Sequence, residues 1–259
     1  MASPPSDARG ALLGRLIDHA ALFPPASLPM DEALAVDRRV RAGEHAWLVD
    51  RFICPASRLA ELPADPPALS VVLDGDLTAD PGGLPVELVE ARCAAEGVAA
   101  TYERVRAAFG PVPLFLELPL GAPLHDVKAV GAGAKVRCGG EAFPATAELA
   151  RFVCDCHTAG IPFKATAGLH HAIRREGAHG FLNLLAAAVF VAAGERVVQE
   201  LLDEEDPDAF IVTPDGLEAH GRHAGRAEIE AARRERLVAY GSCSVDEPLE
   251  DLVALGILP

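Results

Sequence analysis

Short apolar runs alternate with amphipathic segments along most of the chain. The runs are bounded by Gly, Pro or Asp, which is typical of buried strands. We predict a first short strand that ends near His19 and further strands at residues 46–54, 69–73, 98–105, 112–118, 133–138, 161–167 and 237–242. Between them, the apolar spacing of three to four residues predicts helices at residues 29–42, 85–96, 146–159, 180–193, 227–236 and 248–255.

This alternation predicts an α/β fold, because a parallel return between neighbouring strands needs a crossover connection. About eight strands within a single domain, residues 1–259, fit a (β/α)8 TIM barrel best. We expect a degenerate helix between strands 4 and 5, and an acidic insertion at residues 194–226 before strand 8. A doubly wound open sheet is the alternative, but no G-x-G-x-x-G follows the first strand.

The charge balance narrows the choice of partners. The chain has 259 residues and a formal net charge of −15. Nucleic-acid-binding and membrane-surface proteins need a basic face, so we expect neither kind of partner. We expect a small anionic substrate instead. Assembly into a homo-oligomer is possible on this sequence.

The cellular location is predicted from sequence features that direct export or membrane insertion. The longest apolar stretch, residues 181–193, is shorter than the roughly 20 residues that cross a bilayer. The first residues do not resemble a secretory signal, and the six cysteines are scattered without the spacing of a disulfide framework. These features favour a cytoplasmic protein with reduced cysteines.

Lysine is rare in this chain. Of the 23 basic residues, only Lys128, Lys135 and Lys164 are lysines. Arginine can replace lysine as a surface charge, but it cannot form a Schiff base or lose a proton near neutral pH. The two lysines on predicted strands, Lys135 and Lys164, are therefore candidates for chemistry that needs an amine.

Polar residues stand near the end of each predicted strand, where the active sites of parallel barrels lie. In chain order they are His19, Arg51, Asp74, Glu103, Glu117, Lys135 with Arg137, Lys164 with Thr166, and Ser242 with Ser244. Side chains alternate between the two faces of a strand, so each of the two lysines shares a face with the polar residue two positions later. We therefore expect these groups to meet inside the barrel mouth.

The segment Lys164-Ala-Thr-Ala-Gly168 resembles the lysine-bearing strands of deoxyribose-phosphate aldolase and other class I aldolases. This resemblance implies a Schiff base on the strand lysine, with a second cation nearby that lowers the lysine pKa. The chain continues with Leu169-His170-His171 where such aldolases often have a glycine-rich phosphate loop.

The order of Asp74, Glu103, Glu117 and Lys135 is similar to that of the enolase superfamily. In that superfamily, acidic metal ligands stand on the third, fourth and fifth strands and a lysine base stands on a later one. The resemblance implies a divalent cation held by Asp74, Glu103 and Glu117.

Three other groups of residues have side chains that can bind a metal or act as a nucleophile. Adjacent His170 and His171 can both face a ligand if they lie on a loop, so we expect them to bind substrate. Cys154-Asp-Cys156-His157 resembles a metal-binding string, but residues i and i+2 of a helix point apart, which favours core packing. Cys138 follows Arg137 and is a minor nucleophile candidate.

Together these observations predict an aldolase-like lyase or an isomerase that acts on a small anionic carbonyl compound through a Schiff base or an enolate. We assign catalysis to Lys164 as amine or base, to Lys135 and to Glu117 as proton shuttle, without an organic cofactor. The residues expected to bind substrate are Arg51, Asp74, Glu103, Arg137, Thr166, His170, His171 and Ser242. The alternatives are an enzyme dependent on a divalent metal and a non-catalytic binding barrel.

Overall fold

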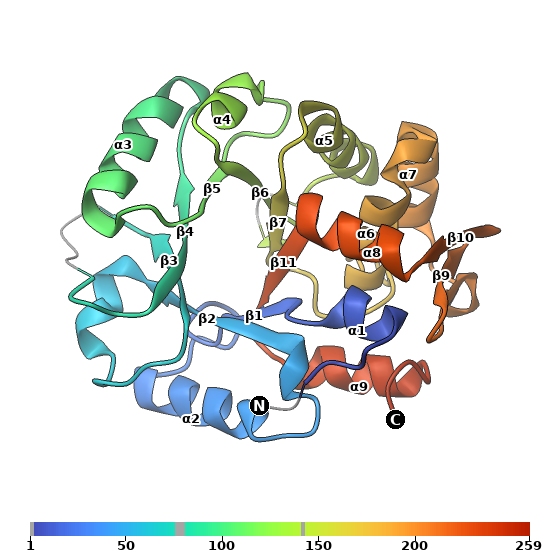
Figure 1. Cartoon of the computed structure of the whole chain (residues 1–259), viewed down its shortest axis with the longest axis horizontal. Coiled ribbons are helices and arrows are strands. Elements are labelled where there is room, and N and C mark those ends of the chain that lie inside the picture. The colour runs from blue at the N-terminus through green and yellow to red at the C-terminus, as the bar shows by residue number, and fades with distance from the viewer. Residues whose placement is uncertain (1–2, 76–80, 141–142) are drawn as a thin grey trace.

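The computed structural model of the chain describes residues 3–75, 81–140 and 143–259, and at its centre is a closed barrel of parallel strands (Figure 1). The strands follow one another around the barrel in chain order, and the last pairs with the first. They are β1 (Ile17–His19), β2 (Val49–Pro55), β3 (Leu69–Leu73), β4 (Val86–Arg92), β5 (Leu114–Glu117), β6 (Gly133–Arg137), β7 (Phe163–Thr166) and β11 (Leu237–Ser242). The predicted (β/α)8 TIM barrel is confirmed.

Helices surround the strands on the outer side of the barrel (Figure 1). They are α1 (Ala8–Leu13), α2 (Met30–Arg41), α3 (Val98–Phe109), α4 (His125–Ala129), α5 (Thr146–Ala159), α6 (Phe181–Phe190), α7 (Glu195–Asp203), α8 (Arg226–Glu235) and α9 (Asp246–Ala254). Among the residues that the structure describes, we find no helix with the length and apolarity of a membrane span.

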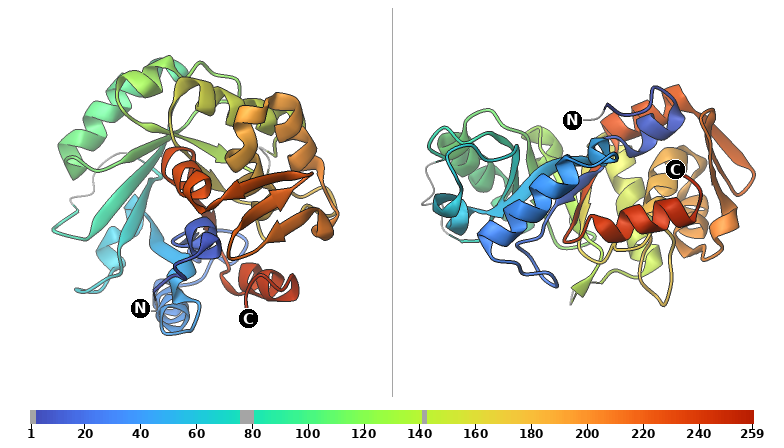
Figure 2. Two further views of the ribbon diagram at one scale, coloured as in Figure 1. Left: turned by 45° about the vertical axis from the view of Figure 1, so that its right-hand side comes forward. Right: turned by 90° about the horizontal axis from the view of Figure 1, so that it is seen from below.

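The segment before the last barrel strand contains a second, smaller sheet. After α7, three antiparallel strands follow: β8 (Phe210–Val212), β9 (Gly216–Ala219) and β10 (Arg222–Gly225). Figure 2 shows this sheet at one side of the barrel, next to α8. The sheet lies within the insertion predicted at residues 194–226.

Side chains of β7 alternate between the interior of the barrel and the helix layer. Phe163 packs outward against Phe152 of α5, with the ring centroids 5.5 Å apart and nearly perpendicular. Lys164 points the other way and pairs with carboxylates of β1 and β4. The predicted facing of the strand is therefore confirmed.

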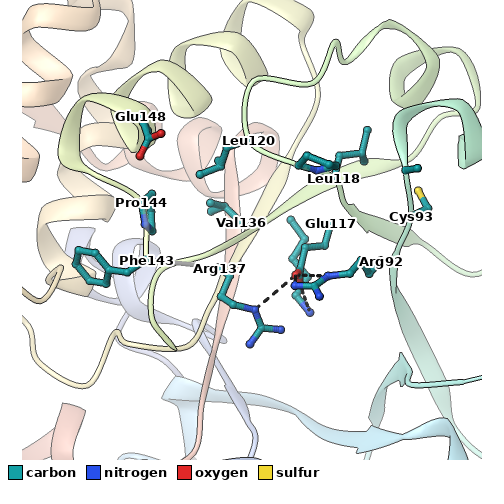
Figure 3. A pocket seen from close by; sticks show the side chains of 13 residues that line it. Arg92, Cys93, Glu117, Leu118, Leu120, Val136, Arg137, Phe143, Pro144 and Glu148 are labelled. Atoms are coloured by element: carbon teal, nitrogen blue, oxygen red, sulfur yellow. Dashed lines mark hydrogen bonds and ion pairs between the residues drawn. The ribbon is translucent and has the colours of Figure 1, made fainter. Parts of the chain in front are cut away.

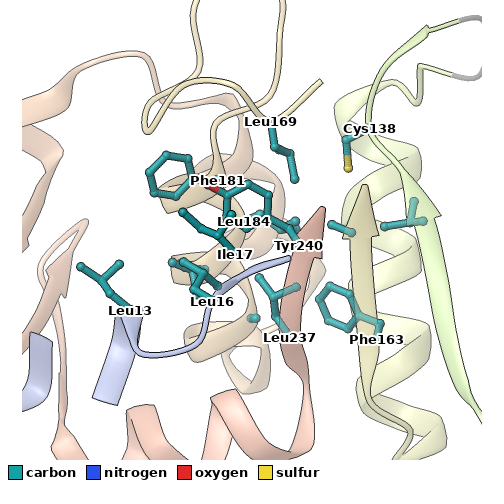
Figure 4. Close-up of a cluster of buried hydrophobic side chains, with 14 of the residues drawn as sticks. Leu13, Leu16, Ile17, Cys138, Phe163, Leu169, Phe181, Leu184, Leu237 and Tyr240 are labelled. Carbon is teal, nitrogen blue, oxygen red and sulfur yellow. The ribbon is translucent and has the colours of Figure 1, made fainter. Parts of the chain in front are cut away.

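The apolar core between the barrel and α6 fixes the strands next to β7 (Figure 4). Tyr240 of β11 stacks on Phe181 of α6 with ring centroids 5.3 Å apart. Ile17 of β1 and Leu237 of β11 belong to the same buried cluster. Because burial of each large apolar side chain contributes roughly 1.5–3 kcal/mol, this layer holds the polar interior in register.

The fourth barrel strand lies earlier in the chain than the apolar pattern predicted. Residues 85–96, predicted as a helix, contain β4, and residues 98–105, predicted as a strand, lie in α3. In α3 the buried positions are Val98, Thr101, Val105 and Phe109, which have helical spacing. The prediction of a degenerate helix between strands 4 and 5 is therefore wrong, because this connection carries the full helix α3. The connection between β2 and β3 carries only the 3-10 segment Ala56–Glu61.

The start of β6 is closely packed, and this packing positions Lys135. A Cβ atom at Gly133 would lie 2.4 Å from the Phe115 ring and 2.9 Å from the Pro162 carbonyl oxygen. We predict that Gly133→Ala lowers the free energy of unfolding by about 1–3 kcal/mol, because the neighbours must shift. Urea unfolding measures the change. At Gly97 the nearest atom is 3.7 Å from the added Cβ, so Gly97→Ala should not destabilise the chain; equal losses in both variants would contradict the packing argument.

Candidate active site at the barrel mouth

The carboxyl ends of the strands open into a cavity of about 370 Å³. In parallel barrels this end carries the active site. The lining comes mainly from strand ends and the loops that follow them: Ala20, Phe23, Pro24, Pro25, Ile53, Val72, Glu90, Lys135, Arg137, Gly139, Gly140, Thr166, Ala167, Gly168, Leu169, His170, Gly241, Ser242 and Cys243. The structure thus brings together Lys135, Arg137, Thr166, His170 and Ser242, which the sequence assigned to the site.

Lys164 lies beneath this cavity and does not line it. Its side chain is 1% exposed, and its ammonium group pairs with the carboxylates of Asp18 and Glu90, at 2.7 Å from Glu90 Oε1. Burial alone would lower the pKa of Lys164, but Asp18 and Glu90 outweigh this effect and raise the pKa. Lys164 is therefore a buried ammonium ion at neutral pH.

Glu90 is the carboxylate shared by both strand lysines. Its Oε1 accepts from Lys164 and, at 2.7 Å, from the Ser70 hydroxyl, while its Oε2 lies 2.7 Å from Lys135 Nζ. Burial would raise the pKa of Glu90, but the positive charges of Lys135 and Lys164 lower it well below its usual range. The lysines face each other directly in the ladder of β6 and β7, so one carboxylate can serve both.

Glu117 contacts Lys135 on the side nearer the protein surface. Its Oε2 lies 3.5 Å from Lys135 Nζ, and its Oε1 lies 2.7 Å from Arg92 Nη2 and 3.5 Å from Arg137 Nε (Figure 3). Burial would raise the pKa of Glu117, but Lys135 and Arg137 lower it, with a further contribution from Arg92. Charges of opposite sign therefore alternate from the barrel centre to its rim.

Arg51 belongs to the opposite end of the barrel, which corrects its predicted place in the mouth. Its guanidinium group lies 2.5 Å from Asp50, 3.5 Å from Asp18 and 3.3 Å from Glu87. The predicted strand started three residues too early, since residues 46–48 form a 3-10 turn and β2 begins at Val49. Arg51 is therefore near the start of its strand. Through Asp18, which also pairs with Lys164, it continues the series of alternating charges toward that end of the barrel.

The acidic metal site predicted from strand order is not formed by the described residues. Asp74 is exposed and accepts hydrogen bonds from the backbone and hydroxyl of Ser57, and it does not line the cavity. Glu103 is exposed on α3, because residues 98–105 are helical. Across residues 3–75, 81–140 and 143–259, no group of three or more His, Cys, Asp or Glu side chains has metal-site geometry.

The two adjacent histidines have different surroundings. His170 lines the cavity, with Nδ1 3.1 Å from Glu247 Oε2 and 3.9 Å from Cys243 Sγ. Its contact with Cys243, followed by that with Glu247, raises the pKa of His170 to about 9, so it is a cation at neutral pH. His171 instead bonds Asp251 at 3.2 Å, outside the cavity lining.

Two further polar groups that the sequence pattern placed near the site face away from it. His19 is fully buried and points toward α2, where its Nδ1 lies 3.0 Å from Asp37. Cys138 is fully buried, and burial raises its pKa to about 12, which keeps the thiol protonated and unreactive. All six cysteines are free, and Cys156 is buried on α5, as expected for core packing.

Sequence reasoning missed Asp18, Glu90 and Arg92. Asp18 stands in a strand of only three residues, too short for a periodic pattern. Glu90 and Arg92 were placed on a predicted helix. The available signal was the strand-like alternation of Glu90, Ala91 and Arg92 after two apolar residues, with a carboxylate facing the same interior as the two lysines.

We predict that Glu90→Gln lowers the free energy of unfolding by about 3–5 kcal/mol, because it leaves Lys135 and Lys164 buried beside an uncharged amide. Urea unfolding at pH 7 measures the loss. Ser70→Ala removes one hydrogen-bond donor from the same charged carboxylate and should cost less, about 1.5–3 kcal/mol. If the two variants lose the same stability, the shared carboxylate is not the main support of the lysine pair.

Stability should also fall in acid. The folded chain lowers the pKa of Glu90 and Glu117, so below an unfolded carboxyl pKa of about 4.3 the unfolded chain binds more protons than the folded chain. The stabilisation is present above that pH and decreases as pH falls toward the folded pKa. Urea midpoints between neutral and acid pH should show a smaller acid loss in Glu90→Gln; an unchanged slope would contradict the assignment.

Comparison with known proteins identifies no relative of this chain. No protein-family model, curated protein or solved structure matches the chain. The case for its function therefore rests on the side chains at the barrel mouth.

Proposed function

We propose that the chain is an enzyme that forms a Schiff base between Lys135 and a small anionic carbonyl compound, and that it cleaves or isomerises this compound through the resulting enamine. The observation that carries the proposal is the pairing of two lysines on one buried carboxylate. Of this pair, Lys135 lines the cavity and Lys164 is enclosed beneath it.

The roles of the two lysines are therefore the reverse of those expected from the sequence. A nucleophilic amine must reach the carbonyl carbon and lose its proton before it attacks. Lys164 has no opening to the cavity, and its raised pKa keeps it charged. Lys135 opens to the cavity, and Lys164 provides a fixed positive charge next to it.

The proposed reaction needs only groups that line the cavity or contact Lys135. The neutral amine of Lys135 attacks the carbonyl carbon, the carbinolamine loses water, and the protonated imine then withdraws electrons from the adjacent carbon–carbon or carbon–hydrogen bond. Glu117 and Glu90 lie within 3.5 Å of Lys135 Nζ and can pass on the proton that the ammonium releases. Both have lowered pKa values and are carboxylates at neutral pH, so they do not keep the proton. It goes on to the carbinolamine hydroxyl, which leaves as water.

The cavity walls supply cations for the anionic group of the substrate. Arg137 and His170 both line the cavity, and His170 is charged at neutral pH because its pKa is raised to about 9. Thr166 and Ser242 add hydroxyl groups to the same lining. A volume of about 370 Å³ suits a compound of metabolite size.

The metal-dependent alternative loses its basis because Glu103 lies on α3. A non-catalytic binding barrel would use the same cavity but form no covalent adduct. Borohydride reduction separates this alternative from the proposed enzyme, since it converts a protonated imine into a stable secondary amine.

We predict that borohydride treatment in the presence of small oxo-acids and hydroxyaldehydes adds the reduced carbon skeleton of one of them to the chain, as seen by intact mass. Lys135→Arg should abolish the adduct, because a guanidinium group does not form the imine. Lys128→Arg is the matched control, since Lys128 lies on the outer helix α4, and it should retain the adduct. No adduct with any compound, or full adduct formation in Lys135→Arg, would overturn the proposal.

A further inference from the structure

A second cavity, of about 610 Å³, opens beside the first over the ends of β4, β5 and β6 (Figure 3). Lys135 and Arg137 line both cavities, so the two spaces adjoin at the proposed reactive amine. The small carbonyl compound proposed above uses the first cavity. The second has no role in that reaction so far, and its lining is chemically distinct.

The side of the second cavity next to Lys135 is cationic. Arg92 and Arg137 approach Glu117 Oε1 from opposite sides, and Arg92 donates to it through both Nε and Nη2, at 3.0 and 2.7 Å (Figure 3). The side chains of Arg92 and Arg137 remain 69% and 38% exposed, so much of each guanidinium group faces solvent. Two guanidinium groups thus converge on one carboxylate, in a chain whose net charge is −15.

The other carboxylate in the lining does not neutralise this pair. Glu148 lies in the first turn of α5 and accepts a hydrogen bond from the Ala145 backbone nitrogen at 2.8 Å. Figure 3 shows it away from the two arginines, on the far side of the cavity. The guanidinium groups therefore retain donors for an incoming anion, and their planar geometry suits a carboxylate.

The walls between these charged groups are apolar. Leu120 and Phe143 are 40% and 42% exposed, and they belong to the few large apolar side chains that are exposed in the described part of the chain. Both line this cavity, and Phe143 is held in place by stacking on His179, with ring centroids 4.7 Å apart. Exposed apolar side chains that gather around a concave site mark a surface that binds a partner.

We propose that the second cavity binds a monocarboxylate with an apolar body. The carboxylate lies against Arg92 and Arg137, and the hydrocarbon lies against Leu120 and Phe143. A monoanion fits better than inorganic phosphate, because Glu117 already occupies part of the guanidinium surface and repels a second negative charge. If the proposed Schiff-base function holds, on which this last step rests, the acid is the second reactant or product beside Lys135.

Calorimetric titration of the full chain with hexanoate tests the site directly. We expect hexanoate to bind at least about tenfold more tightly than hexan-1-ol or inorganic phosphate, because a hydrogen bond to a charged group contributes about 1.5–3 kcal/mol. Arg92→Met should weaken hexanoate binding about tenfold or more, and the exposed Leu120→Ser should also weaken it. Arg196→Met, at a 92% exposed arginine on α7, is the matched control and should bind as the unaltered chain does.

The inference would be overturned by the absence of hexanoate binding, or by binding that is unchanged in both Arg92→Met and Leu120→Ser. A dimer that Leu120→Ser dissociates, without hexanoate binding, would assign the face to contacts between copies and would also overturn it. Hexanoate titration and borohydride treatment of the unaltered chain together separate this inference from the proposed function. Hexanoate binding without a borohydride adduct retains the site and rejects the Schiff base, whereas an adduct without hexanoate binding does the reverse.

Discussion

The interior of this barrel depends on one carboxylate placed between two ammonium groups. Glu90 receives Lys164 on one oxygen and Lys135 on the other, deep between β4, β6 and β7. Each of these charges would be costly to bury alone, and breaking such a pair typically costs several kcal/mol. The barrel therefore needs all three, and the alternating chain continues through Asp18 on one side and Glu117 on the other.

This arrangement gives the two lysines different environments although they face each other across the ladder. Lys164 is held by two carboxylates and has no contact with the cavity, so it serves as a fixed positive charge. Lys135 is held from below by Glu90 but opens to both cavities. The same ion pairs that stabilise the barrel thus leave one amine open to the cavities, with Arg92 and Arg137 near it at the rim.

The apolar pattern was sufficient for the barrel and for the inward direction of Lys135 and Lys164, because both follow from local periodicity. It failed at β4 because the interior of this barrel is charged. The pattern therefore assigned Glu90, which points into the interior, to the solvent-exposed face of a helix. The same error carried Glu103 onto a strand that does not exist. Arg51 was misplaced because the predicted strand began three residues too early. Arg51 therefore seemed to lie near the carboxyl end of β2, whereas it lies near the start of that strand.

The central claim is that Lys164 remains a buried ammonium ion while Lys135 reacts. Nitrogen NMR of the chain labelled at lysine Nζ tests this directly, because only Lys128, Lys135 and Lys164 contribute signals. During reaction with the carbonyl compound that forms the adduct, the Lys135 signal should move to the imine region and the Lys164 signal should keep its ammonium shift. Conversion of the Lys164 signal, with Lys135 unchanged, would contradict the account.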